Sequence, residues 1–214
     1  KRIVAIFVVI ALILNLSSIA FAAEPPKKPI TLPQLKEITF IHYAKPDKPG
    51  KPEPPPVDNT LQVMGIYLPG TANYYVNPSG GPIGAVAEIE LAFERWDAVT
   101  KTELFNLAGQ TTASGFSNDG QNTISWVGIA PTTIIGMTRV GTGMMVTLLR
   151  LTIEEFDIVF NALLKWGIDP DDEGSSKLKN AYDVQNIATH EAGHAVGLDD
   201  LYEDPYRELT MYGK

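Results

Sequence analysis

Two histidines stand four residues apart in a stretch whose small apolar residues repeat with the period of an α-helix. His190 and His194 lie in the segment DVQNIATHEAGHAVGL. The helical period comes from four apolar positions, Val184, Ala188, Ala192 and Ala195. Residues four apart on a helix lie on one face, so the two imidazole rings must project in the same direction. This arrangement constrains the fold more than any other feature of the chain.

Such a helix face has the geometry that a tetrahedral zinc ion needs from two neutral nitrogen ligands. Glu191 is offset by about 100° around the helix, so it can reach a water on the metal as a general base without entering the coordination shell. Gly197 can adopt a positive φ at little cost and end the helix. The chain then reverses direction, which brings Asp200 or Asp199 within reach as the third ligand, with water in the fourth position.

The pattern resembles the extended zinc signature H-E-x-x-H-x-x-G-x-x-H/D of the metzincin metalloproteases, and their matrixin-like branch most closely. The matching residues are His190, Glu191, His194, Gly197 and Asp200. The resemblance implies a catalytic Zn²⁺ bound by the two histidines and Asp200, with Glu191 as the catalytic residue, and it favours Asp200 over Asp199. Most matrixins carry a third histidine at the position of Asp200, and aspartate there is a variant found in snapalysin-like enzymes.

Further segments add to this resemblance. Thr210-Met211-Tyr212 is similar to the methionine turn of that clan, which implies that Met211 packs under the metal and does not bind it. AFERWDAVT resembles the first helix of the matrixin-like branch, and NDGQNTISW resembles its sheet region. The family continues into a further helix after the methionine turn, so we expect the catalytic domain to be truncated at its C-terminal end.

The resemblance also implies where a substrate binds. Metzincin-like enzymes hold an extended peptide against an edge strand, and the order of elements assigns that role to residues 133–140, TIIGMTRV. Ile135, Gly136 and Met137 lie at the centre of this segment and are the expected substrate-binding residues. The alternative is an ordinary sheet strand in which Gly136 marks a bulge.

Composition limits the remaining chemistry. The 214 residues include no cysteine, which excludes disulfides, thiolate zinc sites, a cysteine nucleophile, iron-sulfur clusters and a thiol that could keep a zymogen latent. Any metal must therefore be bound by His, Asp or Glu. A net charge of −8 argues against nucleic acid as a partner. The acidic turns SNDGQN and GIDPDDEGSSK could bind calcium, but neither has the ligand spacing of a known loop, and solvated turns are the simpler interpretation.

The order of the predicted elements indicates the α+β class, with a mixed twisted sheet, a long first helix and an active-site helix. The long helix falls within residues 82–100, with an apolar face of Val86, Ile89, Phe93 and Trp96. Residues 151–166 fit both helical and strand periods, and the β-propensity of FDIVF favours a strand at 155–160. The other predicted strands lie within residues 61–70, 73–81, 123–129, 133–140 and 145–160.

The N-terminal part divides into two segments. Residues 1–23 have the cations, apolar run and small-residue site of a secretory signal peptide, and the alternative is an uncleaved membrane anchor. Residues 24–58 form a proline-rich linker or pro-segment. Within it EITFIHYA, residues 37–44, could be a short strand or a pro-segment contact, and its lone His42 is expected to be structural or solvated. The catalytic domain is then expected over residues 59–214.

Together these features predict a secreted or surface-anchored zinc endopeptidase that acts on a peptide or protein substrate. Two alternatives remain: a non-catalytic binding module with a vestigial metal site, and a zinc aminopeptidase. The intact Glu191 argues against the binding module, because a metal site kept only for structure needs no base beside its first ligand. The extended motif with Met211 argues against an aminopeptidase, by resemblance alone.

Overall fold

The computed structural model describes residues 36–44, 62–145, 150–168, 181–202, 206 and 209–213. The strands are β1 (Lys36–Tyr43), β2 (Ile66–Tyr67), β3 (Ala72–Val76), β4 (Phe105–Gln110), β5 (Asn122–Val127), β6 (Ile134–Met145), β7 (Arg150–Asn161), β8 (Trp166–Gly167) and β9 (Tyr182–Asp183). The helices are α2 (Ala85–Val99) and α3 (Val184–Ala195). Neither helix in this part of the chain is long and apolar enough to cross a membrane.

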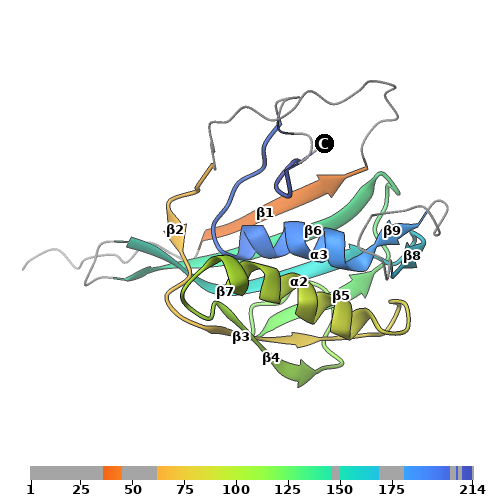
Figure 1. The fold of residues 1–214 in the computed structure, drawn as a ribbon, viewed down its shortest axis with the longest axis horizontal. Coiled ribbons are helices and arrows are strands. Elements are labelled where there is room, and N and C mark those ends of the chain that lie inside the picture. The colour runs from red at the N-terminus through yellow and green to blue at the C-terminus, as the bar shows by residue number, and fades with distance from the viewer. Residues whose placement is uncertain are drawn as a thin grey trace, which may run out of the picture. The chain divides into compact units, whose positions relative to one another are not determined.

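Seven of the described strands form one mixed sheet. Their order is β1-β6-β7-β5-β3-β4, and β2 pairs with β7 beside this row. Strands β3, β4, β5 and β7 pair in parallel, whereas β6 runs antiparallel to β7 and β1 runs antiparallel to β6 (Figure 1). The strands β8 and β9 form a separate short pair that leads into α3. The predicted α+β class with a mixed sheet is therefore confirmed.

Helices α2 and α3 lie on the same side of this sheet (Figure 1). The helix predicted within residues 82–100 is confirmed, and Ile89 and Phe93 of its apolar face are buried. Phe93 stacks on Tyr74 of β3 and meets Phe105 of β4 edge to face, with ring centroids 4.3 Å and 4.6 Å apart. Each such buried aromatic ring contributes on the order of 1.5–3 kcal/mol through its burial. This packing holds α2 on the parallel strands.

The strand predicted at residues 155–160 is confirmed and is longer than expected. It is part of β7, where every side chain from Phe156 to Phe160 is buried. A central strand that is covered on both faces has no polar alternation, which explains why the apolar pattern there fits helix and strand equally well. The strand predicted at residues 133–140 is also confirmed, and β6 continues beyond it to Met145.

The segment EITFIHYA forms β1, which is the outermost strand next to β6. The sheet therefore begins before residue 59, within the interval expected to be linker or pro-segment. His42 was expected to be structural or solvated, and the structure excludes the solvated alternative, because the residue is only 6% exposed. The predicted signal segment and most of the acidic turn GIDPDDEGSSK lie outside the described residues.

Candidate metal centre

Helix α3 has a defined start and a sharp end. At its start the Asp183 carboxylate accepts a hydrogen bond of 2.8 Å from the Asn186 backbone N–H, as an N-cap. At its end Gly197 has a φ of +91°, as its sequence position predicts. A Cβ at that position would lie 2.5 Å from the Ile66 carbonyl oxygen, so both the conformation and the space require glycine. The reversal directs the following residues back along the helix.

The reversal brings one aspartate to the two histidines of α3. The Nε2 atoms of His190 and His194 lie 3.2 Å and 3.6 Å from Oδ1 of Asp200, and all three side chains are almost completely buried. Ligands on a tetrahedral zinc ion are about 3.3 Å apart when the bonds measure about 2.0–2.1 Å. Asp199 is not part of this group of close ligand atoms, and one oxygen of its carboxylate accepts the Asp200 backbone N–H at 2.9 Å.

The three potential ligand atoms are buried and make no hydrogen bond, while their partner atoms are held in place. Nδ1 of His190 is 2.7 Å from the Thr210 carbonyl oxygen, and Nδ1 of His194 is 2.9 Å from that of Leu198. Each carbonyl fixes the proton on Nδ1 and leaves the Nε2 lone pair facing the cluster. The Tyr202 hydroxyl likewise donates to Oδ2 of Asp200 at 2.9 Å. Outer contacts of this kind orient ligands in metal sites, so the donor set fits a metal ion.

Glu191 is completely buried between α3 and β6. The Thr138 hydroxyl donates to its Oε2 at 2.5 Å, whereas its Oε1 has no hydrogen-bond partner. Gly136 permits this close approach, because a Cβ there would lie 2.9 Å from Oε1. Gly136 of the predicted substrate strand thus adjoins the site, while its neighbours Ile135 and Met137 are on the other face of β6 by strand alternation.

The charges around the cluster favour a cation at its centre. Burial lowers the pKa of His194, but for His190 the Asp200 and Glu191 carboxylates outweigh burial and raise the pKa. Burial alone raises the pKa of Asp200 and Glu191, but the neighbouring imidazoles outweigh it and hold both below their usual values. Both carboxylates are therefore ionised, and they attract positive charge to the point where the nitrogens converge.

Met211 is buried and packs directly on α3. A Cβ on Gly193 would lie only 2.2 Å from its Sδ atom, so the glycine in HEAGH makes room for the methionine. The turn around Met211 is joined to the residue after Asp200, since the Leu201 N–H donates to the Met211 carbonyl at 2.8 Å. The same turn provides the Thr210 carbonyl that orients His190. The predicted methionine turn therefore lies against the helix that carries both histidines.

Two residues of β1 that the sequence did not assign to the site also lie there. The Phe40 ring stacks on His194 with a centroid distance of 4.1 Å and an interplanar angle of 12°. The His42 ring is 4.1 Å from that of His190, and its Nδ1 is 3.6 Å from Oε1 of Glu191. Residues 40 and 42 alternate with Ile41 and share one strand face. This alternation is the one sequence signal that places Phe40 and His42 together. It does not indicate that they lie at the site, because the partner strand β6 is about a hundred residues away in the sequence.

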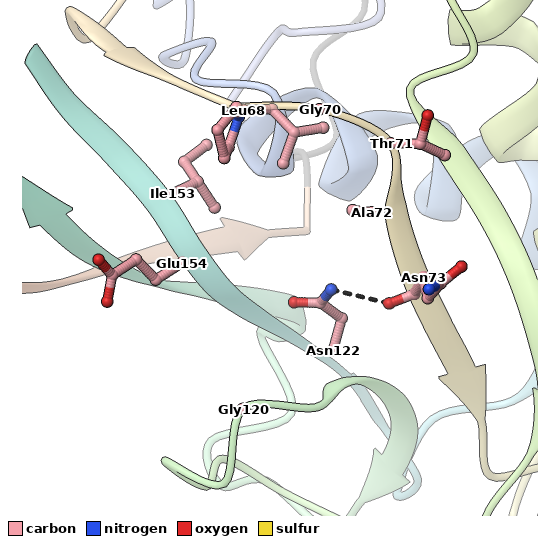
Figure 2. A pocket seen from close by; sticks show the side chains of 10 residues that line it. Leu68, Gly70, Thr71, Ala72, Asn73, Gly120, Asn122, Ile153 and Glu154 are labelled. Atoms are coloured by element: carbon pink, nitrogen blue, oxygen red, sulfur yellow. Dashed lines mark hydrogen bonds between the residues drawn. The ribbon is translucent and has the colours of Figure 1, made fainter. Parts of the chain in front are cut away.

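A hollow of about 410 Å³ lies elsewhere in the described part of the chain, between β3, β5 and β7. Figure 2 shows its wall, where the Asn122 side chain donates to the Asn73 carbonyl at 2.8 Å. None of the residues of the histidine cluster lines it. Asn122 belongs to the turn SNDGQN that could bind calcium, but its amide oxygen accepts a hydrogen bond of 2.7 Å from the Phe156 backbone N–H. Among the described residues, the two groups of potential metal ligands that lie close together both include residues of α3.

A scan of protein-family models found none that matches the chain, and a search of curated proteins found no match either.

Proposed function

We propose that this protein is a zinc-dependent endopeptidase whose metal ligands are His190, His194 and Asp200. The observation that carries the proposal is the convergence of three buried ligand atoms that have no hydrogen-bond partner: the two histidine Nε2 atoms lie 3.2 Å and 3.6 Å from Asp200 Oδ1, close to the ligand spacing of a tetrahedral zinc site, and each side chain is oriented by an outer contact. Three protein ligands leave one position for water and substrate, which is the arrangement of catalytic rather than structural zinc sites. A buried carboxylate beside the first ligand adds the base that hydrolysis requires.

Bound zinc supplies an electrophile that polarises the scissile carbonyl and makes a water molecule acidic. Glu191 then acts as the base, taking a proton from the attacking water and returning it to the departing amine. Its pKa is held low despite burial, so the carboxylate is in the form that accepts a proton. Thr138 positions it by its hydrogen bond to Oε2, which leaves Oε1 as the oxygen directed toward the reaction.

The substrate is proposed to be a peptide chain that binds as an added strand along β6, in place of β1, which pairs with that edge of β6 in this structure. This strand runs past Glu191, and Gly136 brings its backbone close to that carboxylate. Backbone hydrogen bonds along a strand edge hold a peptide in extended form and do not depend on its side chains. An internal peptide bond can lie across the site in this way without any group that recognises a free terminus.

The test is cleavage of denatured casein by the full chain loaded with zinc, with Glu191→Gln as the matched variant. Glutamine keeps the shape of the side chain and the bond from Thr138, but it cannot accept the proton. We expect the variant to bind zinc as the parent does and to lose at least about 100-fold in rate, the lower end of what a general base contributes. Cleavage that Glu191→Gln leaves unchanged would refute the proposed role.

Peptides with blocked and free amino termini separate the two kinds of peptidase. An endopeptidase cleaves both, whereas an aminopeptidase cleaves only the free peptide. Zinc binding at full occupancy without cleavage of casein or of either peptide would instead support a binding module.

A further inference from the structure

Two buried ligand atoms beside the proposed zinc centre have no hydrogen-bond partner and are not among its three ligands. They are Nδ1 of His42 and Oε1 of Glu191. His42 is 6% exposed, and Glu191 is completely buried. Buried polar atoms are almost always paired, so an unpaired nitrogen next to an unpaired oxygen requires an explanation.

The distance between these two atoms suits a shared metal ion better than a hydrogen bond. His42 Nδ1 lies 3.6 Å from Glu191 Oε1. This exceeds the range of about 2.7–3.2 Å for a hydrogen bond between nitrogen and oxygen, but it is close to the separation of about 3.3 Å between two ligands of one tetrahedral zinc ion. The same distance of 3.6 Å separates His194 Nε2 from Asp200 Oδ1 in the proposed centre.

The pair belongs to a second group of potential metal ligands, which it forms with His190. The ligand atoms of His42, His190 and Glu191 all lie within 4.8 Å of one another, as do those of His190, His194 and Asp200. His190 is common to both groups, and its Nδ1 is bonded to a backbone carbonyl. Its remaining nitrogen, Nε2, has one lone pair and can bind one ion only. The protein ligands left for a second ion are therefore His42 Nδ1 and Glu191 Oε1.

Contacts on the far side of each group keep the two atoms directed at each other. The Thr138 hydroxyl donates to Oε2 of Glu191, so Oε1 is the oxygen left for an ion. The His42 ring lies 4.1 Å from that of His190, and the residue pairs with Gly136 of β6. Imidazole nitrogen and carboxylate oxygen are ligands that zinc and other first-row divalent ions accept. The pair is thus chemically suited to such an ion.

From these observations we propose a second divalent-metal site between β1 and α3, in which His42 Nδ1 and Glu191 Oε1 bind a zinc ion and water completes its coordination. The inference rests on the proposed zinc centre, because the second ion lies beside the first. The first ion already balances the charges of the Asp200 and Glu191 carboxylates, so the second binds more weakly. The contrary view is that His42 and Glu191 form an ordinary ion pair and that no second ion binds.

The test follows the three histidines of the chain during a zinc titration. The full chain is labelled with ¹⁵N in its histidine side chains, and NMR spectra are recorded as Zn²⁺ is added. We expect the Nε2 signals of His190 and His194 to shift with the first equivalent, and the Nδ1 signal of His42 to shift with a second. Equilibrium dialysis gives the number of bound ions independently.

Two variants each remove one ligand and keep the neighbouring contacts. His42→Phe retains a ring against His190 but has no nitrogen, and Glu191→Gln keeps the bond from Thr138 but loses the charge. We expect both to keep the tight equivalent and to bind the second ion at least about tenfold more weakly, since even an outer contact of a metal site contributes about 10–100-fold. Thr39→Ala, on the exposed, opposite face of β1, is the matched control and should bind both ions as the parent does.

A second equivalent that binds equally well in the parent and in both variants would overturn the second site. Shifts of the His190 and His194 signals without any later shift of His42 would also overturn it, while leaving the proposed zinc centre supported. No zinc-dependent shift of any histidine signal would overturn the proposed centre itself. The experiment thus separates failure of the inference from failure of the proposed function.

Discussion

The contact between Gly193 and Met211 predicts a specific non-additive effect on stability. Replacing Gly193 with alanine places a Cβ 2.2 Å from Met211 Sδ and 3.0 Å from both Met211 Cε and Trp96 Cζ2. Unstrained carbon contacts are about 3.5–4.0 Å, so the methyl group overlaps the methionine severely. Overpacking of this kind costs about 1–3 kcal/mol, and the helix propensity of alanine returns about 1 kcal/mol. We expect Gly193→Ala to lower the free energy of unfolding by up to about 2 kcal/mol.

The double variant gives the sharper test. Met211→Ala alone should cost about 2–5 kcal/mol, because it leaves a cavity beneath α3. In Gly193→Ala/Met211→Ala the new methyl group enters that cavity, so the combined loss should fall short of the summed losses by about 1 kcal/mol or more. Urea denaturation in the presence of EDTA measures all four proteins without a contribution from metal. Asn186→Ala, at an exposed position of α3, is the control for helix propensity.

Two results together would contradict this prediction: a Gly193→Ala variant as stable as the Asn186→Ala control, and losses that add within about 0.3–0.5 kcal/mol. Such a result would mean that Met211 does not lie against the helix.

Other predictions concern single positions. Burial raises the pKa of Asp157 to about 6, so the folded form holds the proton more tightly than the unfolded form. The stability of the parent relative to Asp157→Asn should therefore fall as pH rises from about 4 to about 6. Urea midpoints that show no such difference across this range would mean that the carboxyl is solvated. Gly136→Ala should slow casein cleavage at least about tenfold without weakening zinc binding, since its Cβ would lie 2.9 Å from Glu191 Oε1 and displace the base. Gly128→Ala, whose Cβ would meet only ordinary contacts, is its control, and equal rates in the two variants would contradict the prediction. Tyr202→Phe removes the bond to the third ligand and should weaken zinc binding by about 10–100-fold in a chelator competition, so an unchanged affinity would mean that this contact does not orient the ligand.

Local patterns predicted much of the fold because each depends on residues close in sequence. The apolar period of residues 82–100 and the capping glycine at 197 define α2 and the end of α3 without reference to other elements. That an aspartate after Gly197 lies beside His190 could be predicted for the same reason, since about ten residues separate them, but only the resemblance favoured Asp200 over Asp199.

Pairing between distant strands could not be predicted in this way. The β-propensity of the segment around His42 indicates a short strand. Its hydrogen bonds are to β6, however, and no local pattern in the sequence specifies which strand it pairs with. The hydroxyl of Thr138 reaches Glu191 for the same long-range reason. A lone histidine is most often structural, so His42 had no stronger interpretation until the register placed it opposite Gly136.

The assignment of His190, His194 and Asp200 as metal ligands is tested most directly by a zinc titration of the full chain against a chromophoric chelator. This assignment predicts one tightly bound equivalent in the parent and in Asp199→Ala, and loss of that binding in His194→Ala and in Asp200→Ala. Binding that survives both His194→Ala and Asp200→Ala would contradict it, because the three converging atoms would then not be the metal ligands.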